Sequence, residues 1–268
     1  MSFRIIIALI CFVLFTRVGQ AQEIDTLVDV GGYKLHFHIK KGKGVPIVFE
    51  SGGGDDGSVW QPLLGNLYKS LGATLVTYDR AGFGKSGIDT AGLNIITEVQ
   101  KLEKGLKKLG FAKSCFLVAH SLGGSYSMVF AARNQREVKG AVFIDINTPC
   151  FMTVQKTREI QSSYSSQLPT FKKERPGVYF LLSNYEITNN EMREAAPKIR
   201  MPITVIGADH PPYQGADSML WKNCLKSFAM ERPNRKYILA TNTGHYVFRD
   251  SPDVVAREIV SLYKDVCR

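Results

Sequence analysis

Short apolar segments that read as strands alternate with amphipathic helices along most of this chain. The expected strands are residues 33–39, 46–50, 74–79, 115–119, 140–145, 202–209 and 236–241. The expected helices are residues 58–72, 94–110, 122–134, 217–230 and 252–266. Strands of continuous apolar character that alternate with helices are typical of a sheet covered on both faces. We therefore predict an α/β fold with a mostly parallel central sheet of about eight strands and helices on both faces.

The alternation breaks between residues 147 and 200. This segment is rich in aromatic side chains and reads as short helical or irregular pieces without a clear strand. Open α/β sheets bind their ligands beyond the carboxyl ends of the strands, where an insertion between two strands also lies. We therefore expect a helical lid of about residues 147–200. The length of 268 residues fits one such domain over residues 22–268.

The first residues read as a targeting segment rather than as part of the fold. Arg4 precedes an apolar run over residues 5–15, and the small residues Gly19 and Ala21 follow it. The run is shorter than the roughly 20 residues that a membrane-spanning helix needs. We therefore expect residues 1–21 to be a cleaved signal peptide. The mature protein is then expected to be exported, to a periplasm or beyond the cell, without stable membrane insertion.

The charge and the cysteine content limit the kinds of ligand and partner that we expect. The net charge is +10, but the lysines are scattered along turns and helix faces, and no nucleic-acid module is found. We therefore expect a small-molecule substrate and no nucleic acid. No CxxC pair or Cys/His cluster occurs, so no metal site is expected. An exported chain would keep Cys115, Cys150, Cys224 and Cys267, which allow one or two disulfides; their pairing and the oligomeric state stay open.

One serine stands between an apolar strand and a helix. Residues 116–126 read FLVAHSLGGSY. Ala119, Ser121 and Gly123 fit the nucleophile-elbow pattern G-x-S-x-G, with alanine in place of the first glycine. The positions two before and two after the serine must be small, because strand and helix nearly touch there. The following helix directs its free N–H groups at the serine oxygen, so we expect Ser121 to be a nucleophile.

A serine hydroxyl needs a base and an acid that orients the base. His245 lies in the loop NTGHY after the last expected strand, which fits the chain order serine, acid, histidine. Asp209 ends the segment PITVIGAD and is the leading candidate for the acid. Asp145 ends GAVFID and is the alternative, because an acid after that earlier strand also reaches the histidine. His120 is expected to support packing, since an elbow directs consecutive side chains apart.

Acyl transfer also needs N–H donors for the oxyanion. The segment FESGGGDDGSVW places a glycine-rich loop after an expected strand. We expect the N–H groups of Gly53 and Leu122 to be the two donors. Asp55 and Asp56, which follow in the loop, are interpreted as solvated acids.

Six segments together resemble the α/β-hydrolase superfamily, in the serine-hydrolase branch with a lid after the sixth strand. They are FESGGG, YDRAGFGKSG, AHSLGG, GAVFID, PITVIGAD and NTGHY, which occur in the family's order and span nearly the whole mature chain. The resemblance implies a carboxylesterase-like enzyme that forms an acyl-enzyme and needs no metal or organic cofactor. It also implies a structural role for YDRAGFGKSG, so Asp79 and Arg80 are given no catalytic role. The sequence departs from the common family pattern at two positions. Ala119 replaces the first glycine of the elbow, and Ser51 stands where many members have histidine.

Other activities stay open on the sequence. They include a lactonase, a thioesterase, an acyltransferase, a slow-turnover small-molecule receptor and an aminopeptidase of the proline-releasing type. The loop SGGGDD lacks the His-Gly-Gly-Pro-Gly run typical of proline iminopeptidases. Glu174, Glu186 and Glu191 in the expected lid are nevertheless candidates to bind a substrate amine. The substrate stays open because the lid sets it.

Overall fold

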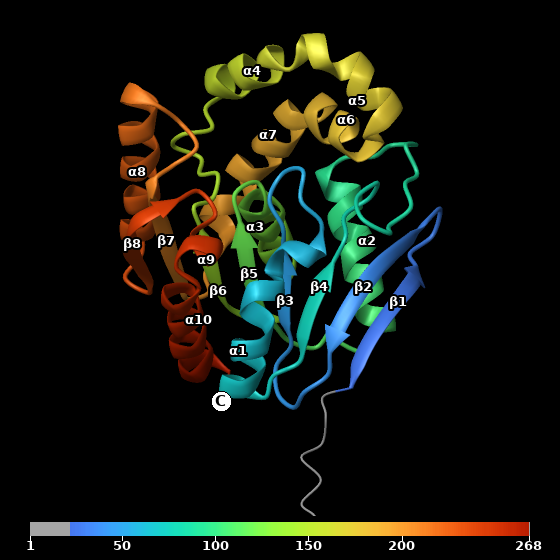
Figure 1. Ribbon diagram of the computed structural model, residues 1–268, viewed down its shortest axis with the longest axis vertical. Coiled ribbons are helices and arrows are strands. Elements are labelled where there is room, and N and C mark those ends of the chain that lie inside the picture. Colours follow the sequence, from blue (N-terminus) through green and yellow to red (C-terminus); the bar gives the residue numbers. More distant parts are fainter. Residues whose placement is uncertain (1–21, 268) are drawn as a thin grey trace, which may run out of the picture.

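The computed structural model describes residues 22–267, so the expected signal peptide, residues 1–21, lies outside the described residues. An eight-stranded sheet forms the centre of the molecule, in the order β1-β2-β4-β3-β5-β6-β7-β8 (Figure 1). The strands are β1 (Glu23–Asp29), β2 (Lys34–Lys40), β3 (Ile47–Glu50), β4 (Leu75–Tyr78), β5 (Cys115–His120), β6 (Val138–Ile144), β7 (Ile203–His210) and β8 (Arg235–Gly244). Strands β3 to β8 pair in parallel, whereas β2 pairs antiparallel with β1 and β4. The predicted mostly parallel sheet is confirmed.

Strand burial follows position in the sheet. Strands β3, β4 and β5 are buried at every residue, because helices cover both faces of the parallel part. Strand β1 lies at the edge and alternates exposed and half-buried residues. Its acidic residues hide the apolar pattern, and the sequence did not predict this strand.

Two helical layers cover the sheet. In Figure 1, α1 and α10 lie in front of the sheet and α2 and α3 behind it. The helices of the two layers are α1 (Gln61–Leu71), α9 (Val247–Asp250) and α10 (Pro252–Val266) on one face, and α2 (Ile95–Lys108), α3 (Gly123–Arg133) and α8 (Gly215–Met230) on the other. Their apolar faces form two buried clusters separated by the sheet. These clusters hold the strand ends rigidly, and the strand ends carry the site.

The chain between β6 and β7 forms the helical insertion. It contains α4 (Val154–Ser163), α5 (Leu168–Glu174), α6 (Pro176–Ser183) and α7 (Tyr185–Ala195), with the short 3-10 turns η2 (Ser165–Gln167) and η3 (Ala196–Lys198). In Figure 1, α4, α5 and α6 arch over one end of the sheet. A disulfide joins Cys150, before α4, to Cys224 in α8, while Cys115 and Cys267 are free. The insertion is therefore tied covalently to the sheet-covering layer.

Among residues 22–267, every helix is too short or too polar to cross a bilayer.

Candidate active site

Ser121 occupies a sharp turn between β5 and α3. Its φ of 53° is in the left-handed region, which costs energy for a residue with a side chain. The turn needs Gly123, because a Cβ there would lie 2.5 Å from the carbonyl oxygens of Glu50 and Ser51. Ala119, at the other small position of the pattern, is fully buried. The expected elbow is therefore present, with strand and helix in close contact around the serine.

His245 lies against this serine. Its Nε2 is 2.9 Å from Ser121 Oγ, and its Nδ1 is 2.6 Å from Asp145 Oδ2. The histidine follows the end of β8, and Asp145 follows the end of β6. Serine, histidine and carboxylate thus form one hydrogen-bonded line at the ends of β5, β6 and β8, which is the arrangement of a catalytic triad.

Asp145 is held from several sides. The residue is fully buried, and its φ of 45° also lies in the left-handed region. Its Oδ1 accepts hydrogen bonds from Trp221 Nε1 at 2.8 Å and from the N–H of Ala208 at 3.1 Å, while its Oδ2 faces His245. Both carboxylate oxygens therefore have donors, which fixes the direction from which the acid meets the imidazole.

Asp209, the leading candidate for the acid, lies elsewhere. Strand β7 continues through this residue to His210 and pairs with β8. The Asp209 carboxylate is partly exposed, accepts the N–H of Asn242 at 3.3 Å and lies 3.7 Å from Lys222 Nζ. The prediction that Asp209 orients His245 is therefore corrected, and the alternative, Asp145, takes that position.

His120 supports the base from behind. Its Nε2 donates a hydrogen bond of 3.0 Å to the carbonyl oxygen of His245, and the two ring centroids are 4.5 Å apart. Burial lowers the pKa of His120 well below its ordinary value, and the nearby His245 lowers it further. A neutral ring that donates from Nε2 fixes the backbone of His245. The expected packing role is thus more specific than the sequence indicated.

The two expected oxyanion donors lie beside the serine. Gly53 and Leu122 line the same cavity as Ser121 and His245. Leu122 is the N-cap of α3, and within residues 22–267 neither its N–H nor that of Gly53 donates to a protein acceptor. Both donors are therefore available to an oxygen of a substrate bound at Ser121.

A buried arginine holds the glycine-rich loop around Gly53 in place. Arg80 is 3% exposed, and its Nη1 lies 2.7 Å from Glu50 Oε1 and 2.6 Å from the carbonyl oxygen of Ser51. Its Nη2 donates to the carbonyl oxygen of Gly52. Arg80 thus turns the carbonyl groups before Gly53 away from the cavity. Arg80 belongs to the segment YDRAGFGKSG, for which the resemblance implied a structural role. These contacts show what that role is.

A cavity of about 320 Å³ lies over Ser121 and His245. Most of its wall comes from the insertion and is apolar. Its aliphatic, proline and phenylalanine side chains are Leu122, Ile160, Phe171, Val178, Leu181, Leu182 and Pro212. The sequence did not mark its polar lining residues, which include Asn147, Arg175 and Trp221. None of the three lies in a recognisable motif, so no sequence signal could have identified them.

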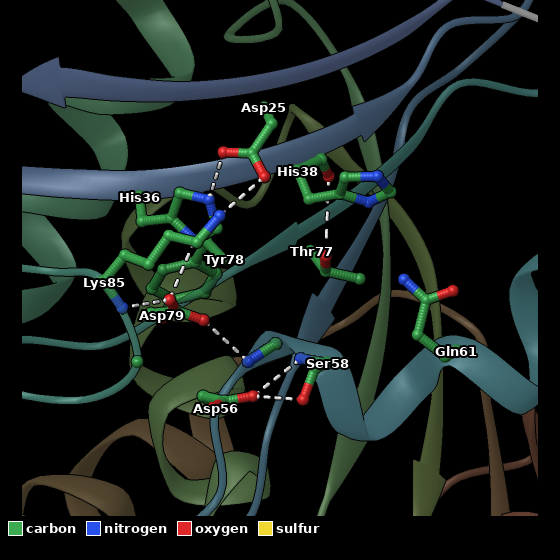
Figure 2. Close-up of a pocket in the computed structure, with 12 residues that line it drawn as sticks. Asp25, His36, His38, Asp56, Ser58, Gln61, Thr77, Tyr78, Asp79 and Lys85 are labelled. Atoms are coloured by element: carbon green, nitrogen blue, oxygen red, sulfur yellow. Dashed lines mark hydrogen bonds and ion pairs between the residues drawn. The ribbon is translucent and has the colours of Figure 1, made fainter.

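A second cavity of about 210 Å³ lies at β2, β4 and η1 (Gly57–Trp60) (Figure 2), and it is lined mostly by polar residue types but not by Ser121, Asp145 or His245. Figure 2 shows the His36 ring between two carboxylates, with Nε2 2.7 Å from Asp25 and Nδ1 2.8 Å from Asp79. Hydrogen bonds from Lys85 and His36 lower the pKa of Asp25 to about 2. In residues 22–267, no group of three or more suitable side chains could hold a metal ion. Through His36 and Lys85, these contacts link Asp25 of β1 to the loop after β4.

Comparisons with known proteins agree with this architecture. Residues 45–177 match the family model described as alpha/beta hydrolase fold. The uncharacterized protein YqjL of Bacillus subtilis (strain 168) is 27% identical over 251 residues, which cover 93% of this chain and 96% of YqjL.

Two solved structures have the same fold. A bromoperoxidase from Bacillus anthracis aligns with a TM-score of 0.71 and 17% identity, over 90% of this chain and 100% of that one. The esterase EaEST from Exiguobacterium antarcticum aligns with a TM-score of 0.68 and 17% identity, with the same coverage of both chains. At this identity the likeness extends to the fold alone.

Proposed function

The chain belongs to the α/β-hydrolase superfamily, and from this we propose that it is a carboxylesterase-like serine hydrolase. It would cleave a carboxylic ester, or a similar acyl bond, of a small and partly apolar substrate. The observation that carries the proposal is the hydrogen-bonded line from Ser121 through His245 to Asp145, which opens into a cavity.

The first step is attack by the serine. Asp145 accepts the Nδ1–H of His245, so the Nε2 lone pair faces the Ser121 hydroxyl at 2.9 Å. Nε2 takes the hydroxyl proton as Oγ bonds to the substrate carbonyl carbon. The buried carboxylate then stabilises the imidazolium, and it does not itself take the proton.

The carbonyl oxygen becomes an oxyanion in this step. It would lie between the N–H groups of Gly53 and Leu122, at the positive end of α3. Donors of this kind are already oriented before the reaction, and loss of one typically lowers kcat about 100- to 1,000-fold.

The intermediate collapses when Nε2 of His245 gives its proton to the leaving alcohol oxygen. The acyl group then remains on Ser121 Oγ. Water attacks this acyl-enzyme, His245 takes a proton from the water, and the same N–H groups hold the second oxyanion. Release of the carboxylic acid restores the serine hydroxyl. These groups need no cofactor for either step.

The cavity favours this reaction over release of an amino-terminal residue. Glu174, Glu186 and Glu191 do not line it, and Glu186 is bonded to Arg158 at 2.7 Å. A substrate ammonium group would therefore meet no carboxylate next to Ser121. Lactones and thioesters remain chemically equivalent targets for the same groups, and analysis of the products separates them.

Export remains part of the proposal. Disulfides persist in oxidising compartments and are rare in the cytosol. The bond between Cys150 and Cys224 supports a periplasmic or secreted location after cleavage at about Ala21. Mass spectrometry of the mature amino terminus, with fractionation of the producing cells, tests this location.

The catalytic proposal is tested with 4-nitrophenyl butyrate and 4-nitrophenyl hexanoate, together with a fluorophosphonate probe. We expect the wild type to hydrolyse the esters and to be labelled on Ser121. Ser121→Ala should lose both, because no other group would replace the nucleophile. Full turnover by Ser121→Ala would refute the mechanism.

A further inference from the structure

In the described part of the chain, the cavity wall carries a positive charge and no negative charge. Arg175 is the one permanently charged side chain among the described residues that line the cavity, and no aspartate or glutamate lines it. Arg175 lies between α5 and α6, and its Nη2 is 3.5 Å from the carbonyl oxygen of Gly54, in the glycine-rich loop around Gly53. An anionic group would thus meet an exposed guanidinium on a wall whose other side chains are mostly apolar.

Arg175 also has no acidic partner. Within residues 22–267, no carboxylate lies at ion-pair distance from it. Two other cations of the insertion do have acidic partners, since Arg158 pairs with Glu186 and Lys156 pairs with Asp217. A guanidinium fork matches a carboxylate with two parallel hydrogen bonds. Arg175 is therefore equipped for an anion that the chain itself does not supply.

Asn147 provides a second, independent observation. The residue is 3% exposed and lines the cavity, and its Nδ2 makes no hydrogen bond of ordinary geometry in the described part of the chain, although its side chain lies near the Tyr185 hydroxyl. Its backbone N–H donates to the carbonyl oxygen of Ser121 at 3.2 Å, which keeps it next to the nucleophile. Buried amide groups are normally paired, because an unpaired one loses its hydration without compensation. A substrate oxygen near the scissile bond would satisfy this donor.

We propose that the substrate is an ester or similar acyl compound that carries a carboxylate, which Arg175 binds, and an oxygen acceptor near the scissile bond, which Asn147 binds. This inference rests on the proposed function and narrows its substrate class. The mostly apolar lining of the cavity fits a hydrocarbon segment that joins the carboxylate to the acyl bond. The net charge is +10 for the full sequence and +8 without Arg4 and Arg17 of the expected signal peptide, and a positive charge of this size attracts anionic substrates at long range.

The first experiment compares esters that differ only in a terminal carboxylate. Mono-4-nitrophenyl adipate and 4-nitrophenyl hexanoate have the same acyl length. A second pair, 4-carboxyphenyl hexanoate and phenyl hexanoate, places the charge on the alcohol side. We expect the wild type to prefer the charged member of one pair by about 10-fold or more in kcat/KM. The pair that shows the preference identifies the side of the scissile bond that faces Arg175.

Variants assign this preference to the side chain. In Arg175→Gln, the kcat/KM ratio of charged to neutral ester should fall about 10- to 100-fold, as expected for loss of a hydrogen bond to a charged group. Arg175→Lys should restore part of the ratio, since it keeps the charge without the fork. Lys173→Gln is the matched control, because it removes one exposed charge from the same part of the insertion outside the cavity. An unchanged ratio in Arg175→Gln would overturn the proposal.

A binding measurement separates this inference from the catalytic one. Adipate and the neutral adipamide are titrated by calorimetry into Ser121→Ala and into the same protein with Arg175→Gln. Adipate should bind more tightly than adipamide, and Arg175→Gln should weaken it at least 10-fold. This result, with no ester turnover by the wild type, would reject the proposed hydrolysis but retain the anion site. Equal binding of both compounds, unaffected by Arg175→Gln, would reject the anion site whatever the turnover.

Discussion

The indole nitrogen of Trp221 lies 2.8 Å from Oδ1 of Asp145, the carboxylate oxygen that does not face His245. This contact links α8 to the triad. It leaves the other oxygen free to meet the imidazole, and together with the Ala208 N–H it sets the angle of the carboxylate. Trp221 is itself fully buried and also lines the cavity.

Trp221→Phe removes this donor while keeping an aromatic ring. We expect kcat to fall about 10-fold with little change in KM, because the acid loses one of the bonds that orient it. The free energy of unfolding should fall by about 1–3 kcal/mol, since a buried oxygen loses a partner. Phe228→Leu, also buried on α8, is the control for lost packing alone. If Phe228→Leu lowered kcat equally, the orienting role of the indole would be wrong.

Two aspartates distinguish the alternatives for the acid. Asp145→Asn should lower kcat about 10,000-fold, because an amide favours the wrong imidazole tautomer. Asp209→Asn should leave kcat within about twofold, since this carboxylate contacts Asn242 and Lys222 rather than His245. Steady-state kinetics with 4-nitrophenyl hexanoate measures both. A large loss in Asp209→Asn with a small one in Asp145→Asn would reverse the assignment.

The raised pKa of Glu98 allows us to predict how the free energy of unfolding depends on pH. Burial raises its pKa from 4.5 to about 7, although it accepts a hydrogen bond of 2.6 Å from Tyr126. The folded state therefore holds this proton more tightly than the unfolded state, and stability falls as pH rises from about 4.5 to about 7. Glu98→Gln cannot ionise, so it should gain about 1–3 kcal/mol relative to wild type between pH 4.5 and pH 8. Urea unfolding of both proteins at the two pH values measures this gain, and parallel curves would contradict it.

The disulfide predicts a dependence on redox conditions. Cys150 and Cys224 are 74 residues apart, and closing a loop of this size typically stabilises a protein by about 2–4 kcal/mol. Replacing both cysteines by serine should lower the free energy of unfolding by this amount and reduce kcat, because the bond ties the segment after Asp145 to the helix of Trp221. Cys267→Ser, which changes a free cysteine, is the control. Equal stability of wild type with and without reductant would argue against the bond.

Local patterns were sufficient to predict the sheet and the meeting of Ser121 with His245. The elbow needs small residues at defined positions around one serine, and the base follows the last strand. Both features depend on a few neighbouring residues. The apolar strands were equally evident, except β1, whose edge position leaves only a weak alternation.

The choice of acid depended on tertiary structure. Asp145 and Asp209 look alike in the sequence, since each follows an apolar run. The difference is that β6 ends before Asp145, whereas β7 runs through Asp209 and turns its side chain toward Lys222. Similarly, Asn147, Arg175 and Trp221 reach the cavity only because the loop after β6, the junction of α5 and α6, and α8 meet there. No spacing within the sequence records such a meeting.

The origin of the cavity wall has an evolutionary consequence. Ser121, Asp145 and His245 stand at strand ends, whereas most of the wall comes from one continuous segment between β6 and β7. Substitutions, insertions or exchanges within that segment can therefore change which molecule fits the cavity. The positions of Ser121, Asp145 and His245 would stay the same. The same fold can therefore come to bind different molecules through changes in the helical insertion alone, provided that Cys150 keeps its bond to Cys224.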